Sequence, residues 1–133
     1  MRSTRGFSKP VLAAIAKDKI LGVRAGSDDD HRFIGIWAVV VDGRVFVRSW
    51  SLARRSWYTT FREDPQGTIQ AAGRELRVRA VTSVSEKTKA AVDAAYAEKY
   101  DTPGAIRYVK GFKRSKRRRD TTTELLPRQA PPS

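Results

Sequence analysis

The order of apolar and polar residues predicts short helices and strands from the start of the chain. Residues 8–17 place apolar side chains on one helical face, behind a serine that can cap the helix and a proline in its first turn. Residues 19–24 are predicted as a strand, and residues 25–30 have the composition of a loop. The chain is therefore expected to begin as helix, strand and loop.

The clearest pattern is a pair of strands joined by Asp42 and Gly43. Residues 33–41 and 44–50 are rich in β-branched and aromatic side chains. The Asp-Gly dipeptide between them is typical of a type I′ turn, which needs a positive φ at both central positions. Because residues 33–41 are almost all apolar, this strand is expected in the middle of a sheet with both faces buried.

A second hairpin is predicted around Gly73, after a short helix over residues 51–62. Its strands cover residues 68–71 and 75–81. Apolar and charged side chains alternate along the second of them, so one face is expected to point inward and the other into solvent.

The last third of the chain is predicted as helix, short helix and strand. Ser83 and Glu86 have the spacing of a capping box, and the helix behind them runs to about Tyr100. Residues 105–112 are expected to form one or two helical turns. Residues 121–126 are predicted as a strand at the edge of the sheet.

Two hairpins, the helices around them and a strand from the C-terminus favour an α+β fold built on a closed or half-closed antiparallel barrel. A length of 133 residues and a hydrophobic content of 40% suit a single domain, expected over residues 1–126. The proline-rich residues 127–133 are expected to be a disordered tail.

The chain is strongly basic, with a net charge of +13 from 27 Lys and Arg against 14 Asp and Glu. Seven of these cations lie within residues 110–119, which hold no acidic residue, and the surplus without them falls to 13 − 7 = +6. The segment could contact nucleic acid phosphates, reach the phosphate or acidic tail of a cofactor, or be a solvated basic loop. These cations are Lys110, Lys113, Arg114, Lys116, Arg117, Arg118 and Arg119.

Composition also narrows the compartment and the chemistry. There is no apolar run of about 18 residues and no signal-like N-terminus, so the protein is expected in the cytoplasm and not in a membrane. The absence of cysteine excludes disulfides, thiolate zinc sites and a cysteine nucleophile. His31 is the only histidine, and alone in an acidic loop it is expected to be exposed or to brace that loop rather than to bind metal.

Candidate binding residues gather after the first hairpin. A strand end, a hydroxyl and guanidinium groups ahead of a helix could together bind a phosphate, at Arg48, Ser49, Arg54 and Arg55. The alternative is that these arginines are solvated. Trp37 is expected in the core, whereas Trp50 and Trp57 could stack on a ligand or fill the core and a dimer interface.

Several of these segments resemble a bacterial family of unknown function that is related to the deazaflavin-dependent nitroreductases. The resemblance rests on the hairpin of residues 36–49 and on residues 56–58, 67–70, 93–100 and 121–125. The wider group includes the flavin reductases and pyridoxine-phosphate oxidases. It implies a flavin-binding split β-barrel, usually a homodimer, with FMN or deazaflavin in a groove at the dimer interface.

The resemblance also implies a site, in which a strand ending at a small residue leads to a Trp-Tyr pair and a proline. Here these are Ser49, Trp57, Tyr58 and Pro65. The glycine-rich loop of the enzymes is replaced by residues 50–56, and their Arg-Lys-Thr-Gly segment by residues 25–30. The implied cofactor-binding residues are Arg48, Ser49, Trp50, Arg54, Arg55, Trp57 and Tyr58.

Two functions follow from this sequence. The first is a flavin- or deazaflavin-dependent reductase, because the cofactor would perform the hydride transfer and the protein would need no catalytic signature of its own. The second is a non-enzymatic protein that binds nucleic acid or another polyanion through its basic surface, with no cofactor. The sequence identifies no catalytic residue.

Overall fold

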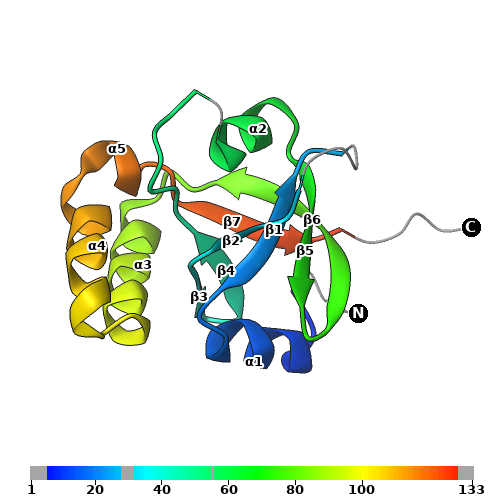
Figure 1. The fold of residues 1–133 in the computed structure, drawn as a ribbon, viewed down its shortest axis with the longest axis horizontal. Helices are drawn as coiled ribbons and strands as arrows, with labels where there is room; N and C mark the ends of the chain where they lie inside the picture. The colour runs from blue at the N-terminus through cyan, green and yellow to red at the C-terminus, as the bar shows by residue number, and fades with distance from the viewer. Residues whose placement is uncertain (1–5, 28–31, 55, 129–133) are drawn as a thin grey trace, which may run out of the picture.

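The computed structural model describes residues 6–27, 32–54 and 56–128. These residues form one antiparallel sheet of seven strands in the order β2-β1-β5-β6-β7-β4-β3, with helices around it (Figure 1). The elements are α1 (Lys9–Lys17), β1 (Leu21–Ala25), β2 (Ile34–Ile36), β3 (Ala38–Val41), β4 (Arg44–Val47), α2 (Trp57–Glu63), β5 (Gln66–Ala71), β6 (Arg74–Thr82), α3 (Glu86–Lys99), α4 (Pro103–Arg114), α5 (Lys116–Arg119) and β7 (Thr123–Pro127).

The sheet is a nearly closed barrel, which confirms the predicted α+β split barrel. Its two terminal strands, β2 and β3, follow one another in the chain and are separated only by Trp37. β2 pairs with β1, whereas β3 pairs with β4. The prediction of one strand over residues 33–41 in the middle of a sheet was therefore wrong. Both faces of β3 are covered nonetheless, one by the barrel interior and the other by helices.

Both predicted hairpins are present, and both have turns with two successive positive φ angles. Asp42 and Gly43 have φ of 52° and 75°, as the type I′ turn requires. Ala72 and Gly73 have φ of 54° and 71°. The positive φ of Ala72 is unusual for a residue with a β-carbon, so the pairing of β5 with β6 on either side must stabilise the turn.

The last strand, β7, lies inside the sheet and not at its edge as predicted. It pairs with β6 on one side and with β4 on the other, so that Leu125 faces both Ala80 and Val45. Leu125 is buried in the barrel interior. Pro127 belongs to β7, and the amide of Arg128 donates to the carbonyl of Arg77 at 2.9 Å. The remainder of the predicted tail, residues 129–133, lies outside the described residues.

Two helices begin later than predicted. α2 begins at Trp57 instead of residue 51, and the hydroxyl of Ser56 accepts a hydrogen bond from the amide of Thr59 at its start. α3 is capped by Ser85 and not by Ser83. Ser83 continues the pairing of β6 with the last strand, since its amide donates to the carbonyl of Thr122.

Apolar side chains form two separate cores. One fills the barrel, where Val11 and Ile15 of α1 meet the inward residues of the strands. The other lies between the outer face of β3 and β4 and the helices α3 and α4, which Figure 1 shows next to each other. Tyr96 is fully buried in this second core, where its hydroxyl donates to the carbonyl of Trp37 and accepts from the amide of Arg48.

Lys99, at the end of α3, connects the two cores. Its ammonium donates to the carbonyls of Ile15 at 2.8 Å and Ala38 at 2.6 Å. Burial lowers the pKa of Lys99 to about 8, and the neighbouring positive charge of Lys19 contributes to the shift.

The free energy of unfolding is expected to rise between pH 8 and pH 10 because of Lys99. In this window the unfolded chain still holds the proton that folded Lys99 has released, and stability rises with pH wherever the unfolded state binds more protons. Burial raises the pKa of Tyr100 to about 12, so this group opposes the trend only above pH 10. Urea unfolding at both pH values should show a smaller rise in Lys99→Met. Equal rises in the two proteins would contradict the assignment.

Candidate functional site

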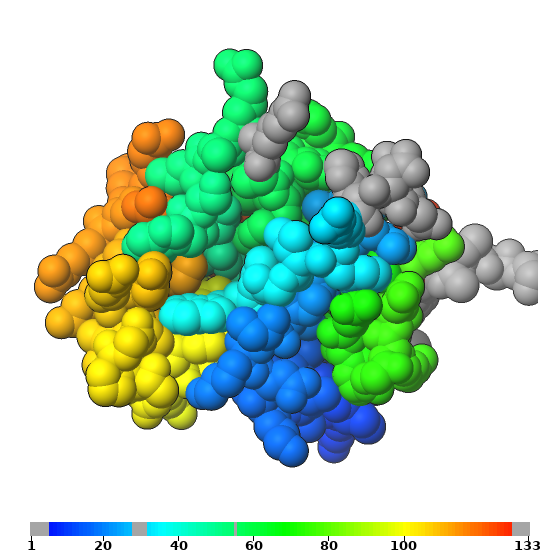
Figure 2. Space-filling view, in the orientation of Figure 1, coloured from blue at the N-terminus to red at the C-terminus, as the bar shows by residue number. Residues whose placement is uncertain are grey.

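An aromatic cavity of about 320 Å³ lies where β2, the segment of residues 48–54 and α4 meet. Figure 2 views the molecule from this side, with β2 in cyan, that segment in green and α4 in yellow to orange. Tyr108 and Phe112, one helical turn apart on α4, form one wall. The lining residues are mostly aromatic or apolar: Gly35, Ile36, Trp37, Arg48, Trp50, Ser51, Trp57, Tyr108 and Phe112.

Trp50 is held against α4 although its side chain is partly exposed. Its ring meets those of Tyr108 and Phe112 edge to face, with centroids 5.0 Å and 5.6 Å apart. A β-carbon at Gly111 would lie 2.6 Å from the indole, so this close approach needs glycine. The Arg118 guanidinium covers the ring at 4.1 Å. Trp50 is therefore a fixed wall of the cavity.

A second cavity, of about 830 Å³, adjoins the first and shares Ser51 and Trp57 with it. Its lining is more polar, with the hydroxyls of serine and threonine, two guanidinium groups and one carboxylate. The residues are Val23, Ala25, Arg32, Ile34, Ser51, Arg54, Ser56, Trp57, Thr59, Thr60 and Glu63. We call the two cavities together the Trp57 groove, because Trp57 lies between its aromatic end and its hydroxyl end.

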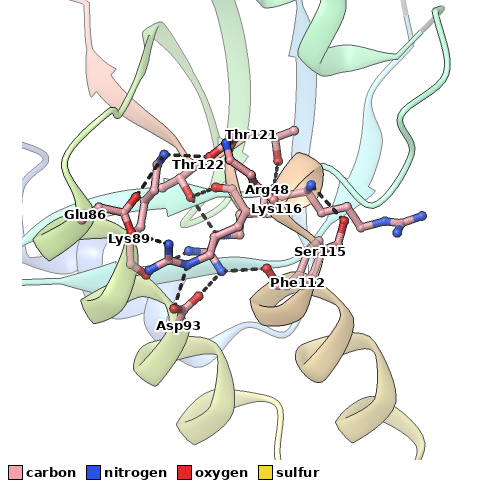
Figure 3. Close-up of polar contacts among 12 residues, drawn as sticks. Arg48, Glu86, Lys89, Asp93, Phe112, Ser115, Lys116, Thr121 and Thr122 are labelled. Atoms are coloured by element: carbon pink, nitrogen blue, oxygen red, sulfur yellow. Dashed lines mark hydrogen bonds and ion pairs between the residues drawn. The ribbon is translucent and has the colours of Figure 1, made fainter.

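Arg48 borders the aromatic cavity, but its guanidinium is fully buried and bound to the protein itself (Figure 3). It donates to Asp93 Oδ1 at 2.6 Å, Thr122 Oγ1 at 2.8 Å, the Lys89 carbonyl at 2.9 Å and the Phe112 carbonyl at 3.4 Å. Four of its five N–H groups thus have acceptors. Arg48, directly after β4, therefore connects this strand to α3, α4 and Thr122 and uses most of its donors within the protein, whereas the sequence predicted a phosphate ligand.

The other predicted site residues separate into two groups. Trp50, Arg54 and Trp57 line the Trp57 groove. Ser49 is buried, and its hydroxyl donates to the Ser51 carbonyl at 2.6 Å instead of facing a ligand. Tyr58 lines neither cavity and contacts Trp57 edge to face. Arg55 and His31 lie outside the described residues.

Sequence reasoning missed much of the lining of the groove. Tyr108 and Phe112 have the i, i+4 spacing of one helical face, but the cations around Phe112 concealed that signal. Phe112 is buried in the second core, so its ring is not exposed for stacking on a nucleic acid base. Arg32, Thr59 and Thr60 carried no motif. Arg32 precedes β2 and the two threonines lie on α2, and only the fold brings them to one cavity.

The basic segment of residues 110–119 spans the end of α4 and all of α5, with a break at Ser115, and three of its seven cations bind other parts of the protein. Lys116 pairs with Asp120, Arg119 pairs with Glu86 and Asp93, and Arg118 donates to the Trp50 carbonyl. The other four are exposed and pair with no carboxylate among the described residues. We call these four the basic face: Lys110, Lys113, Arg114 and Arg117.

Two further sequence-based predictions concern metals and membranes. The described residues contain no group of three His, Asp or Glu side chains arranged to hold a metal ion. No helix in this part of the chain has both the length and the apolar character needed to cross a membrane. The homodimer implied by the resemblance stays a prediction.

Comparison with solved structures shows the same fold in distant proteins. A conserved hypothetical protein from Mycobacterium tuberculosis superposes with a TM-score of 0.61 at 13% identity, covering 96% of this chain and 85% of that one. An FAD-binding protein from Mesorhizobium loti superposes with a TM-score of 0.59 at 11% identity, covering 90% and 88%. A search of curated proteins gives no match.

A family match covers most of the chain. The family described as an uncharacterized protein conserved in bacteria (DUF2255) matches residues 11–125, from the first helix to the last strand. The protein therefore belongs to this bacterial family.

Proposed function

We propose that this protein binds a flavin-type cofactor, FMN or a deazaflavin, in the Trp57 groove. The observation that carries the proposal is the joining of an aromatic cavity to a hydroxyl-rich cavity with two guanidinium groups. A flavin has the same two-part chemistry, with a flat aromatic ring at one end and a phosphorylated chain at the other. The fold shared with an FAD-binding protein gives further support.

Each end of the groove suits one part of the cofactor. Trp50, Trp57 and Tyr108 offer apolar ring surfaces, and aromatic groups gain energy from stacked or edge-to-face contacts beyond simple burial. Arg32 and Arg54 offer charge-assisted hydrogen bonds, the strongest kind available to a phosphate. The ring would therefore lie at the aromatic end, and the phosphate at the hydroxyl end.

A bound flavin would supply hydride transfer, which makes a reductase the reaction class that we propose. The residues of the chain would bind and orient it. Trp50, fixed against α4, would also exclude water from one side of the aromatic end.

FMN is expected to bind at least tenfold more tightly than riboflavin, which lacks the phosphate, and Arg54→Gln should remove most of that difference. A hydrogen bond to a charged group contributes about 1.5–3 kcal/mol, which corresponds to roughly a tenfold to hundredfold change in affinity. Quenching of flavin fluorescence measures both affinities. Arg62→Gln is the matched control, because Arg62 is on the same helix as the groove residues but lines neither cavity.

The measured affinities test the placement of the phosphate and the proposed function separately. Equal affinities for FMN and riboflavin would contradict the placement of the phosphate. Failure to bind FMN, FAD and deazaflavin would contradict the proposed function itself.

The basic face supports a second candidate function, the binding of nucleic acid through its phosphates. Lys110, Lys113 and Arg114 have the i, i+3, i+4 spacing that places side chains on one side of α4. Arg117 follows on α5, after the break at Ser115. The contacts would be independent of base sequence and sensitive to salt.

Lys110→Gln/Arg114→Gln is expected to weaken binding of a labelled single-stranded oligonucleotide. The slope of log affinity against log salt should fall by about 1.4, because each lost phosphate contact removes about 0.7. Lys116→Gln is the control, since Lys116 already pairs with Asp120. Binding that does not respond to salt would exclude this function.

A further inference from the structure

A row of polar side chains crosses the outer face of four neighbouring strands. Arg24 on β1 lies opposite Thr68 on β5, and Thr68 lies opposite Arg77 on β6. The amide of Arg128 extends the ladder beyond β7 by donating to the Arg77 carbonyl at 2.9 Å. We call these four residues the arginine row. Arg77 and Arg128 are thus neighbours across the ladder, and Thr68 separates Arg77 from Arg24.

The arginine row lies on the other face of β1 from the Trp57 groove. Val23 and Ala25 line the hydroxyl end of that groove. Successive side chains of a strand point to opposite faces, so Arg24, between these two residues, points away from it. The row is therefore a separate feature from the proposed flavin site.

The arginine row borders a cavity of about 260 Å³ whose lining is predominantly polar. Among the described lining residues, three arginines and two hydroxyl side chains accompany one carboxylate, that of Glu75. The lining residues are Arg24, Gly26, Ser27, Gln66, Gly67, Thr68, Glu75, Arg77 and Arg128. Arg77, Arg128 and Glu75 carry a net charge of 2 − 1 = +1, apart from Arg24, which has interactions of its own within the protein. A small concave site with this surplus favours an anion.

Arg24 and Arg128 both have contacts within the protein. Arg128 donates to Gln66 Oε1 at 2.7 Å, and Arg24 lies over the Phe33 ring at 4.6 Å. Arg77 is exposed and pairs with no carboxylate among the described residues. The nearby Asp64 carboxylate accepts from the amide and the hydroxyl of Ser27.

Fold stability does not explain the arrangement of the arginines. Like charges on directly opposite strand positions destabilise a sheet, and Arg77 and Arg128 occupy such positions. A bound anion would remove the repulsion, and the forked guanidinium group fits the oxygens of a phosphate in a bidentate manner.

We propose that this cavity binds the phosphate group of a small molecule, as a phosphomonoester or a diphosphate. Arg77 and Arg128 supply the charge-assisted hydrogen bonds, and the Thr68 hydroxyl between Arg24 and Arg77 supplies a further donor. Glu75, at the same cavity, accepts a hydrogen bond from a hydroxyl of the group that carries the phosphate. The site does not depend on flavin binding.

Titration of the purified protein with inorganic phosphate and with pyrophosphate tests the site. Both anions are expected to raise the melting temperature more than sodium chloride at equal ionic strength. Arg77→Gln/Arg128→Gln should weaken pyrophosphate binding by at least tenfold in calorimetry. Arg79→Gln is the matched control, because Arg79 is an exposed arginine two residues along β6 and does not line the cavity.

Two outcomes of these titrations would overturn the proposal. One is a double variant that binds pyrophosphate as the original protein does. The other is stabilisation by sodium chloride equal to that by the phosphates. The double variant should also keep its FMN affinity, so a failure of this site is distinguishable from a failure of the Trp57 groove. Competition between pyrophosphate and FMN in the original protein would place the phosphate in the groove and contradict a separate site.

Discussion

Replacing Arg48 with methionine is expected to lower the free energy of unfolding by about 3 kcal/mol, because breaking a buried ion pair from one side costs about 3–5 kcal/mol. The substitution removes donors from Asp93, Thr122 and the Lys89 carbonyl, all of which are largely buried. We expect the lower end of the range because Asp93 keeps Arg119, whose Nε lies 3.0 Å away. Urea unfolding followed by circular dichroism measures the change.

Arg44→Met is the matched control, because Arg44 begins β4 and Arg48 directly follows this strand. Arg44 contacts Glu124 with two hydrogen bonds, of 2.7 Å and 3.0 Å, but its side chain is 51% exposed. Exposed pairs typically contribute about 0–1 kcal/mol. Equal losses in the two variants would contradict the structural role of Arg48. A stable Arg48→Met protein that no longer binds FMN would instead restore Arg48 as a ligand-binding residue.

Replacing Trp57 with leucine is expected to weaken FMN binding by about 30-fold. Trp57 borders both halves of the groove, and truncation of a central aromatic contact commonly costs 2 kcal/mol or more, about 30-fold in affinity. Leucine keeps an apolar side chain against Phe61, which supports the fold. Flavin fluorescence gives the affinity, and thermal unfolding checks that the variant is folded.

Comparing the affinities for FMN and riboflavin distinguishes the role of Trp57 from that of Arg54. Trp57→Leu should weaken FMN and riboflavin alike, because the lost contact is to the ring, whereas Arg54→Gln should affect FMN alone. Tyr58→Leu is the control, since Tyr58 is adjacent in the chain and lines neither cavity. An equal loss of FMN affinity in the Tyr58 variant would show that the ring does not lie against Trp57.

The sequence by itself determined the local features of this protein. The turn at Asp42 and Gly43 was predictable because the conformation depends on two residues and their tolerance of positive φ. The inward face of β6 followed from alternation, and the first helix followed from its capping serine and its apolar spacing. Trp50, Arg54 and Trp57 could be placed near a ligand because they follow the first hairpin closely along the chain.

Only the tertiary structure decided which distant segments meet. Residues 33–41 divide at Trp37 because their two halves pair with different strands, and nothing within those residues specifies the partners. The sequence around Arg48 predicted a phosphate ligand. The fold instead places Asp93 of α3, Phe112 of α4 and Thr122 against its guanidinium as acceptors. The arginine row arises from the register of four strands. Burial and non-local pairing set the role of each charge, and both depend on the complete fold.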